Sequence, residues 1–153
     1  HYDAMRTSLL LAVLGFCFAV EVEDVPVQRL PAAVVTTIRE RFPKALLAEA
    51  TRDVRTAFYE VTLKSDGRVY DVTLAAGGAL ERIAKEVTIA ELPKSVKAAL
   101  DKAYPKAKIK SLIEVTKIVD RRDERDGYRA YLDVPGERPV LVRIERDGNL
   151  TKR

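Results

Sequence analysis

Two stretches of the chain share one pattern of hydrophobic and polar positions. They begin at Leu30 and Leu92, and every matched position is displaced by 62 residues. In each stretch a Leu-Pro pair comes first, apolar residues then recur at spacings of four, and an aromatic residue followed by Pro ends the pattern. Apolar residues at this spacing form one face of a helix, Pro suits the first helical position, and a residue before Pro disfavours helical geometry. The pattern therefore predicts two helices related by an internal duplication.

Alternating apolar and polar residues follow the first predicted helix and predict β-strands. The clearest run covers 58–63, and Asp66-Gly67 then turns the chain, as Asp-Gly does in hairpins, into a run over 69–74. A third run covers 80–87, and a weaker alternation over 45–57 allows one more strand. On the two clearest strands the side chains predicted to face the core are Tyr59, Val61, Leu63, Tyr70, Val72 and Leu74.

The second copy repeats this order of strands with a longer first hairpin. Alternation predicts strands over 109–120 and 128–134, and we interpret the charged stretch 121–127 as the loop between them. Matching Gly78 to Gly148 gives a displacement of 70, which places about eight extra residues in this hairpin. In the last clear strand the side chains predicted to face the core are Val140, Val142 and Ile144.

These elements predict an α+β fold of two tandem helix-plus-antiparallel-strands repeats, with the helices packed on one face of an antiparallel sheet. We place the first repeat at 30–91 and the second at 92–153. Residues 20–29 contain Pro26 and have no sustained period, so we interpret them as a linker or a short leading edge segment.

The stretch 5–19 has the pattern of a secretory signal peptide. A basic start precedes an apolar run, and small residues, Cys17 and Ala19, occupy the positions that a signal peptidase requires. We predict cleavage after Ala19, a periplasmic or secreted location, and no stable insertion in a membrane afterwards. Lipid attachment at Cys17 is the alternative. Residues His1 to Ala4 precede the first Met and are assigned no role.

The composition is that of a globular protein with a mixed surface. Of the 153 residues, 47% are hydrophobic and 33% charged, and 27 basic against 23 acidic side chains leave a net charge of +4. The charges are interspersed along the chain, whereas nucleic-acid binding favours clustered Lys and Arg with stacking aromatics. We therefore expect no nucleic-acid partner.

The sequence offers few residues for catalysis or metal binding. It has one His and one Cys, and neither lies in the predicted mature chain, so we expect no enzyme and no cofactor. A group of carboxylates in 120–126 does not have the spacing of a calcium-binding loop, and Arg residues interrupt it, so we interpret it as a solvated hairpin tip. We interpret Gly77-Gly78 as a plain turn, because no Lys-Ser/Thr follows it.

The order of these motifs resembles the PepSY-like family. A helix opened by Leu-Pro-x-x-Val and closed by Phe/Tyr-Pro-x-Ala precedes Tyr-x-Val-x-Leu, a Gly turn, Val-x-Leu and a Gly-x-Leu tail. Two such units in tandem are similar to the β-lactamase-inhibitor-protein-like branch of the family, and the resemblance covers nearly all of 30–153. It implies a secreted or periplasmic protein whose helices lie on one face of a curved sheet, with the other face available to a protein partner.

Residues on that other face are the candidate binding residues. Strand alternation places aromatic and Arg side chains on an otherwise polar surface there, which is typical of a protein interface, although they would also suit a solvated sheet face. We predict a non-enzymatic, inhibitor-like module that binds a protein or peptide outside the cytoplasm. The alternative is an extracytoplasmic sensor or chaperone-like module for a small ligand or a metal. The predicted partner-binding residues are Phe58, Glu60, Arg129, Tyr131 and Arg143.

Overall fold

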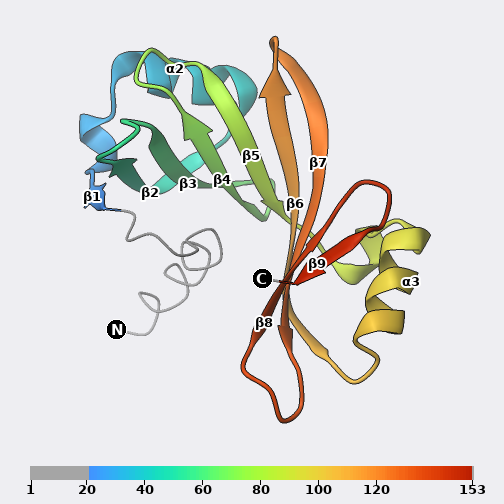
Figure 1. Ribbon diagram of the computed structural model, residues 1–153. Helices are drawn as coiled ribbons and strands as arrows, with labels where there is room; N and C mark the ends of the chain where they lie inside the picture. The colour runs from blue at the N-terminus through green and yellow to red at the C-terminus, as the bar shows by residue number, and fades with distance from the viewer. Residues whose placement is uncertain (1–20, 153) are drawn as a thin grey trace.

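Each strand of the sheet pairs with the strands before and after it in the sequence. The computed structural model describes residues 21–152, in which nine antiparallel strands form one sheet in the order β1 to β9 (Figure 1). The strands are β1 (Val22–Asp24), β2 (Leu46–Asp53), β3 (Tyr59–Ser65), β4 (Arg68–Leu74), β5 (Leu80–Glu86), β6 (Lys108–Val119), β7 (Arg122–Asp133), β8 (Val140–Ile144) and β9 (Leu150–Lys152). The helices are η1 (Val27–Arg29), α2 (Ala32–Arg41), η2 (Ile89–Glu91) and α3 (Lys94–Ala103).

The predicted signal peptide, with Cys17 and Ala19, lies outside the described residues. Within 21–152, no helix combines the length and the apolar character needed to cross a bilayer.

The two α-helices begin and end at the residues that their Pro pairs indicate. Pro31 and Pro93 are the N-caps, one position before the predicted place at the start of each helix. Phe42 and Tyr104 are the C-caps. Their N–H groups donate hydrogen bonds to the carbonyl oxygens four residues earlier, those of Ile38 and Leu100, at 2.7 and 2.8 Å. Each helix turns two aliphatic side chains fully inward, which are Val34 and Ile38 in α2 and Val96 and Leu100 in α3.

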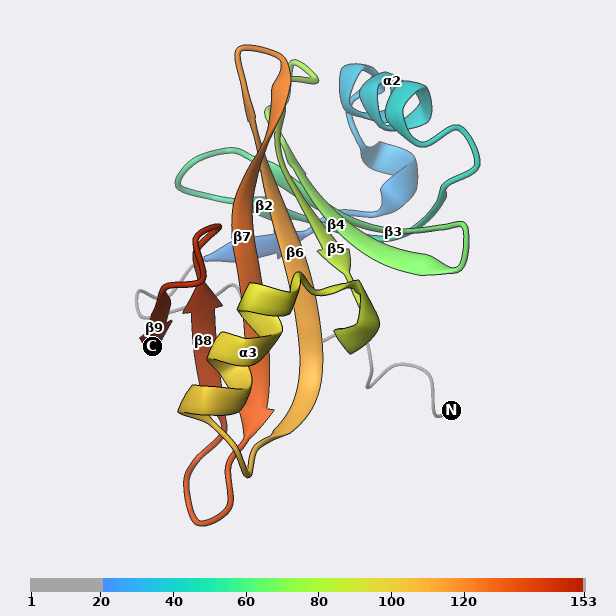
Figure 2. The ribbon, with the colours of Figure 1, turned by 90° about the vertical axis from the view of Figure 1, so that its right-hand side faces the viewer.

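Each α-helix contributes to its own hydrophobic core. The α2 core joins Val34 and Ile38 to the side chains of β3 and β4 that are predicted to face the core. The α3 core joins Val96 and Leu100 to inward-facing side chains of β7 and β8, which are Tyr128, Ala130, Leu132, Val140, Val142 and Ile144. Ile83 of β5 belongs to the first core and Val87, just beyond it, to the second. Since these two residues have the same parity on one extended segment, both cores lie on the same face of the sheet. Figure 2 shows the twist of the sheet, with α3 in front of β6 and β7.

The strand before each helix pairs with the strand after it in the same register. Asp24 of β1 lies opposite Thr51, and Glu86 of β5 lies opposite Ile113, a displacement of 62 on both sides. β5 is therefore the last strand of the first unit. It is also equivalent, in the second unit, to β1 of the first unit. The stretch 20–29, interpreted as a linker or a leading edge segment, contains β1 and η1.

One expectation about the second copy is wrong. Residues 121–127 are not a loop, because β6 turns into β7 at Asp120 and Arg121, and β7 already begins at Arg122. Both turn residues have positive φ angles, 49° and 61°. This turn contains no Gly, whereas Asp126 and Gly127 of the stretch interpreted as a loop lie inside β7. The eight additional residues therefore lengthen two paired strands.

Candidate functional site

The face of the sheet opposite α2 and α3, here called the open face, carries rows of polar and apolar side chains. Residues directly opposite one another on neighbouring strands form each row. One row is Glu60, Thr73, Arg82, Lys117 and Glu124; the next is Glu49, Thr62, Asp71, Ala84 and Val115; the third is Glu86, Ile113, Arg129, Arg143 and Thr151.

An apolar patch lies where the two copies meet on the open face. Ala84 of β5 and Ile113 and Val115 of β6 form its centre, and each is about 1% exposed. Tyr131 and Leu141, which lie opposite each other on β7 and β8, pack against this centre and are half-buried. This cluster is separate from the two helix cores, so the open face has an apolar centre of its own.

Asp126 organises the charges beside the apolar patch. Its carboxylate lies 2.9 Å from Nζ of Lys117, 3.2 Å from Nη2 of Arg129 and 3.7 Å from Nη2 of Arg143. Burial alone would raise the pKa of Asp126, but the hydrogen bond and charge of Lys117, the charge of Arg143 and the hydrogen bond from Arg129 outweigh it and lower the pKa. Asp126 therefore holds these three cations in place on the open face.

A β-bulge places Asp126 there. Val115 pairs with Gly127 and Thr116 pairs with Arg125, so Asp126 is the extra residue of β7. Gly127 has a φ of 124°, and a Cβ atom at this position would lie 2.2 Å from the carbonyl oxygen of Ile144. The bulge consequently requires Gly at 127. It turns the Asp126 side chain, expected at a solvated hairpin tip, into an ion network in which Asp126 is 12% exposed and Lys117 remains 53% exposed.

Two carboxyl groups occupy the open face of the first copy. Thr62 donates a hydrogen bond of 2.6 Å to Oδ1 of Asp71, which is 3% exposed. Among residues 21–152, Oδ2 of Asp71 and Oε1 of Glu60 are buried without a hydrogen-bond partner. Burial raises the pKa of Glu60, and the charge of Asp71 raises it further. Burial also raises the pKa of Asp71, against the hydrogen bond from Thr62 and the charge of Arg82. An ionised pair here lacks a counter-charge in direct contact.

The structure brings together three of the five predicted binding residues. Arg129 lies opposite Arg143, and Tyr131 is two residues further along β7 on the same face. Glu60 is on β3, separated from β7 by three strands, and Phe58 precedes β3 with an exposed fraction of 37%. Besides the other members of the rows, the open face contains five residues described above that were not among the predicted five, which are Asp71, Ile113, Val115, Asp126 and Leu141.

Period-two alternation could have revealed that β6 has apolar residues on both faces, because Ile113 and Val115 point to the side opposite Leu112. Asp126 carried no such signal, since its position depends on a bulge. Residues 21–152 contain no His or Cys, and no three Asp or Glu side chains among them are grouped so that they could hold a metal ion. The arrangement on the open face is suited to contact with another molecule, through an apolar centre and fixed charges.

The chain belongs to the PepSY-like family. The family model, described as "Putative beta-lactamase-inhibitor-like, PepSY-like", matches it twice, over residues 19–81 and 76–133. The resemblance stated from the sequence is confirmed. No curated protein has a sequence that matches this chain.

Solved structures with the same fold come from Bacteroides species. A DUF2874 family protein from Bacteroides uniformis has a TM-score of 0.68 and 15% identity, over 80% of this chain and 88% of its own. A BLIP-like protein from Bacteroides fragilis has a TM-score of 0.64 and 16% identity, over 84% and 86%. A "putative periplasmic" protein from Bacteroides eggerthii has a TM-score of 0.66 and 12% identity, over 80% and 87%. At these identities the likeness shows the fold.

Proposed function

We propose that this protein is a non-enzymatic binding module that acts outside the cytoplasm and holds a protein or peptide against the open face of its sheet. The observation that carries the proposal is the pair of half-buried side chains Tyr131 and Leu141, which pack on the buried apolar centre of Ala84, Ile113 and Val115. The patch lies on the face that α2 and α3 do not cover, where the two copies meet.

The composition of this face fits a protein partner. Interfaces commonly have an aromatic and aliphatic centre within a polar rim, and Tyr and Arg are enriched among the residues that dominate affinity. Tyr131 and Leu141 supply the centre, and the Asp126 network fixes Arg129 and Arg143 beside it. Because those Arg side chains are already ordered, little conformational entropy is lost when a partner contacts them.

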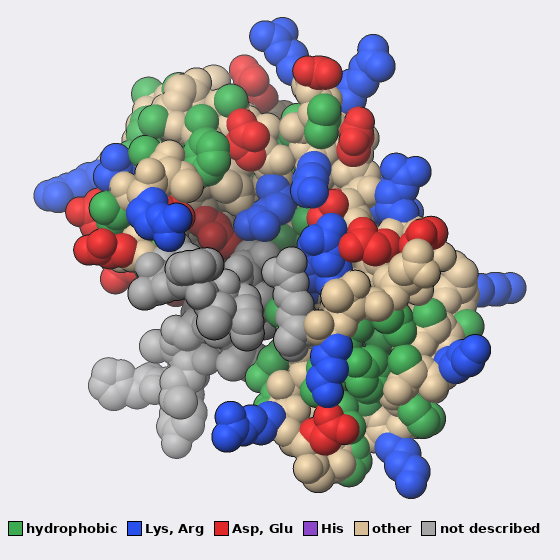
Figure 3. Space-filling view, in the orientation of Figure 1, with side chains coloured by type: hydrophobic (Ala, Val, Ile, Leu, Met, Phe, Trp, Pro, Cys, Tyr) green, Lys and Arg blue, Asp and Glu red, His purple; other side chains and the backbone are tan. Residues whose placement is uncertain are grey.

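The charges of the open face are mixed. Lys117, Arg129 and Arg143 lie close to Asp126, and Arg143 also pairs with Glu145 at 2.6 Å. Basic and acidic side chains lie beside one another over β6 and β7 (Figure 3). We expect a partner whose contact surface likewise carries both signs of charge.

The proposed location rests on two kinds of support. The apolar stretch 5–19 has the pattern of a signal peptide, and the structural neighbour from Bacteroides eggerthii is described as "putative periplasmic". The inhibitor-like part of the proposal rests on the family description and on the BLIP-like neighbour.

Site-specific photo-crosslinking in the producing cell tests the proposal. Benzoylphenylalanine replaces Leu141 on the open face in one variant and Lys97, an exposed residue of α3, in the control. We expect a crosslinked polypeptide at position 141 and none at position 97. Crosslinks only at position 97, or none at either position although both variants fold, would contradict binding at the open face.

A further inference from the structure

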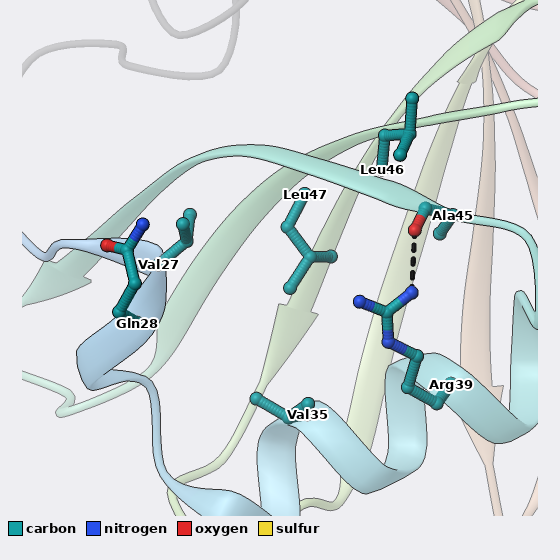
Figure 4. A pocket seen from close by; sticks show the side chains of 7 residues that line it. All are labelled: Val27, Gln28, Val35, Arg39, Ala45, Leu46 and Leu47. Carbon is teal, nitrogen blue, oxygen red and sulfur yellow. Dashed lines mark hydrogen bonds between the residues drawn. The ribbon is translucent and has the colours of Figure 1, made fainter.

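A pocket of 470 Å³ opens between η1, α2 and the start of β2 (Figure 4). Leu47 points from β2 towards α2, where Val35 forms the opposite wall. Val27 lines the pocket from η1, and Leu46, which is 72% exposed, lies at its rim. Because α2 lines the pocket, the pocket lies on the helix side of the sheet and is separate from the open face. Its volume is within the range of sites that take small molecules or single side chains with their backbone.

The fold does not require this pocket, because the second copy has different residues at the same positions. The displacement of 62 matches Val35 to Lys97, Arg39 to Asp101 and Leu46 to Lys108. In α3, Nζ of Lys97 and Oδ2 of Asp101 form an ion pair of 2.9 Å along the helix surface. The same helix and strand therefore form with a charged surface, and the apolar pocket is a feature of the first copy alone among these matched positions.

Arg39 gives the pocket a positive charge in a fixed place. Its Nη1 donates a hydrogen bond of 2.8 Å to the carbonyl oxygen of Ala45, and the other terminal nitrogen turns into the pocket (Figure 4). Within residues 21–152, Arg39 forms no ion pair with a carboxylate. A guanidinium has five N–H donors in a planar fork that fits a carboxylate, so most of its binding capacity remains available.

The strand beside the pocket has a free edge. β1 pairs only with Thr51 to Asp53, and the N–H of Val25 donates to the carbonyl of Ala50, after which the chain turns away at Pro26. Among the described residues, no strand lies on this side of β2 from Leu46 to Glu49. β1 runs antiparallel to β2, so a chain segment that continued its line would run towards Ala45. Its carboxyl end, and not its amino end, would arrive at Arg39.

We propose that this pocket binds the carboxyl-terminal end of an extended polypeptide whose last residue is apolar. The last side chain enters the space between Val35 and Leu47, and the terminal carboxylate accepts hydrogen bonds from the guanidinium of Arg39. The residues before it lie along the free edge of β2, as in other cases where a peptide adds to a sheet edge. This site does not depend on the proposed function of the open face.

Fluorescence anisotropy with a defined peptide tests the site. The probe is fluorescein-labelled Gly-Ser-Gly-Ser-Leu with a free carboxyl terminus, titrated with the purified protein to about 1 mM. The comparison peptides are the same sequence with a carboxyl-terminal amide, and one that ends in Ser. We expect saturable binding of the probe and a loss of at least about tenfold in affinity for each comparison peptide, since one removes the charge and the other the apolar side chain.

Residues of the second copy supply the matched variants. Arg39→Asp and Val35→Lys introduce what α3 has at the same positions, so the helix is expected to fold as α3 does, and each should weaken binding at least about tenfold. Asp101→Ala, the equivalent position in α3, should leave it unchanged. Equal affinity for the acid and the amide, no binding of the probe by a folded protein, or a loss with Asp101→Ala equal to that with Arg39→Asp would overturn the proposal.

Discussion

The hydroxyl of Thr62 donates a hydrogen bond of 2.6 Å to one carboxylate oxygen of Asp71, and the other oxygen is buried without a partner among the described residues. The sheet thus contains a carboxyl group that is only half satisfied, on the face that α2 and α3 do not cover. A group of this kind reduces the stability of the protein.

Asp71→Asn is expected to stabilise the isolated protein at pH 7. Burial raises the pKa of Asp71 in the folded state above its unfolded value, so stability increases as the pH falls through the folded pKa, and the ionised form is penalised above it. Asn keeps an acceptor for Thr62 and carries no charge.

Urea unfolding at pH 7 and pH 4 measures this effect. We expect a higher midpoint for Asp71→Asn at pH 7 and a smaller difference at pH 4, because the raised pKa of Asp71 favours its protonated form as the pH falls. Glu81→Gln, at an exposed position of β5, is the control and should change neither midpoint. A midpoint for Asp71→Asn below that of the wild type at pH 7 would show that Asp71 is stabilised by its surroundings.

Gly127→Ala is expected to destabilise the protein by at least about 2 kcal/mol, because it combines a φ of 124° with a Cβ position 2.2 Å from the carbonyl oxygen of Ile144. Gly77→Ala is the matched control. Its Cβ would meet no atom within 4 Å, so we expect a change within about 0.5 kcal/mol. Denaturant unfolding measures both, and an equal effect of the two substitutions would mean that the bulge in β7 adapts to a side chain.

The aromatic C-caps should contribute equivalently in the two copies. Phe42 packs on Tyr70 with ring centroids 5.0 Å apart, and Tyr104 packs against the α3 core. We expect a loss of about 3 kcal/mol for Phe42→Ala and for Tyr104→Ala, within the range for truncating packed aromatic side chains. Phe58→Ala, at a more exposed position, should cost less than half as much. Losses below about 0.5 kcal/mol at both caps would show that these two side chains do not contribute to the cores.

The periodic part of the fold could be predicted from the sequence because each signal was local. Alternation identified Val61, Leu63, Val72 and Leu74, and all four are fully buried. The Leu-Pro pairs marked both helices to within one residue. The nine-stranded antiparallel sheet with two α-helices agrees with the predicted α+β class.

The hairpin between β6 and β7 could not be predicted in this way. Its turn uses Asp120 and Arg121 at positive φ, which residues other than Gly adopt rarely, and Gly127 serves the bulge in β7. The ion network around Asp126 could not be predicted for the same reason, because a residue in a bulge departs from the period-two pattern.

The binding surfaces depended on contacts across strands and helices. Tyr131, Arg129 and Arg143 were predicted to share a face and do so, because simple alternation holds from Tyr128 to Asp133. The pocket beside Arg39 could not be predicted from local patterns, because its lining comes from three elements. Comparing Val35 with Lys97 would have indicated a difference at this place, because the two copies differ in polarity at this matched position.

The affinity of the partner captured at the open face, measured for the wild type and for Tyr131→Ala, tests the central claim most directly. Tyr131 is half-buried against Ile113 and Val115, so urea unfolding of the variant must first show a folded protein. Ala130→Asp, which places a charge at a position with 0% exposure, serves as the unfolded reference. We predict that Tyr131→Ala weakens binding by about 2 kcal/mol or more, that Arg129→Ala and Arg143→Ala chiefly reduce the association rate and its salt dependence, and that Lys97→Ala has no effect. Unchanged affinity in Tyr131→Ala, Arg129→Ala and Arg143→Ala would contradict a binding role for the open face.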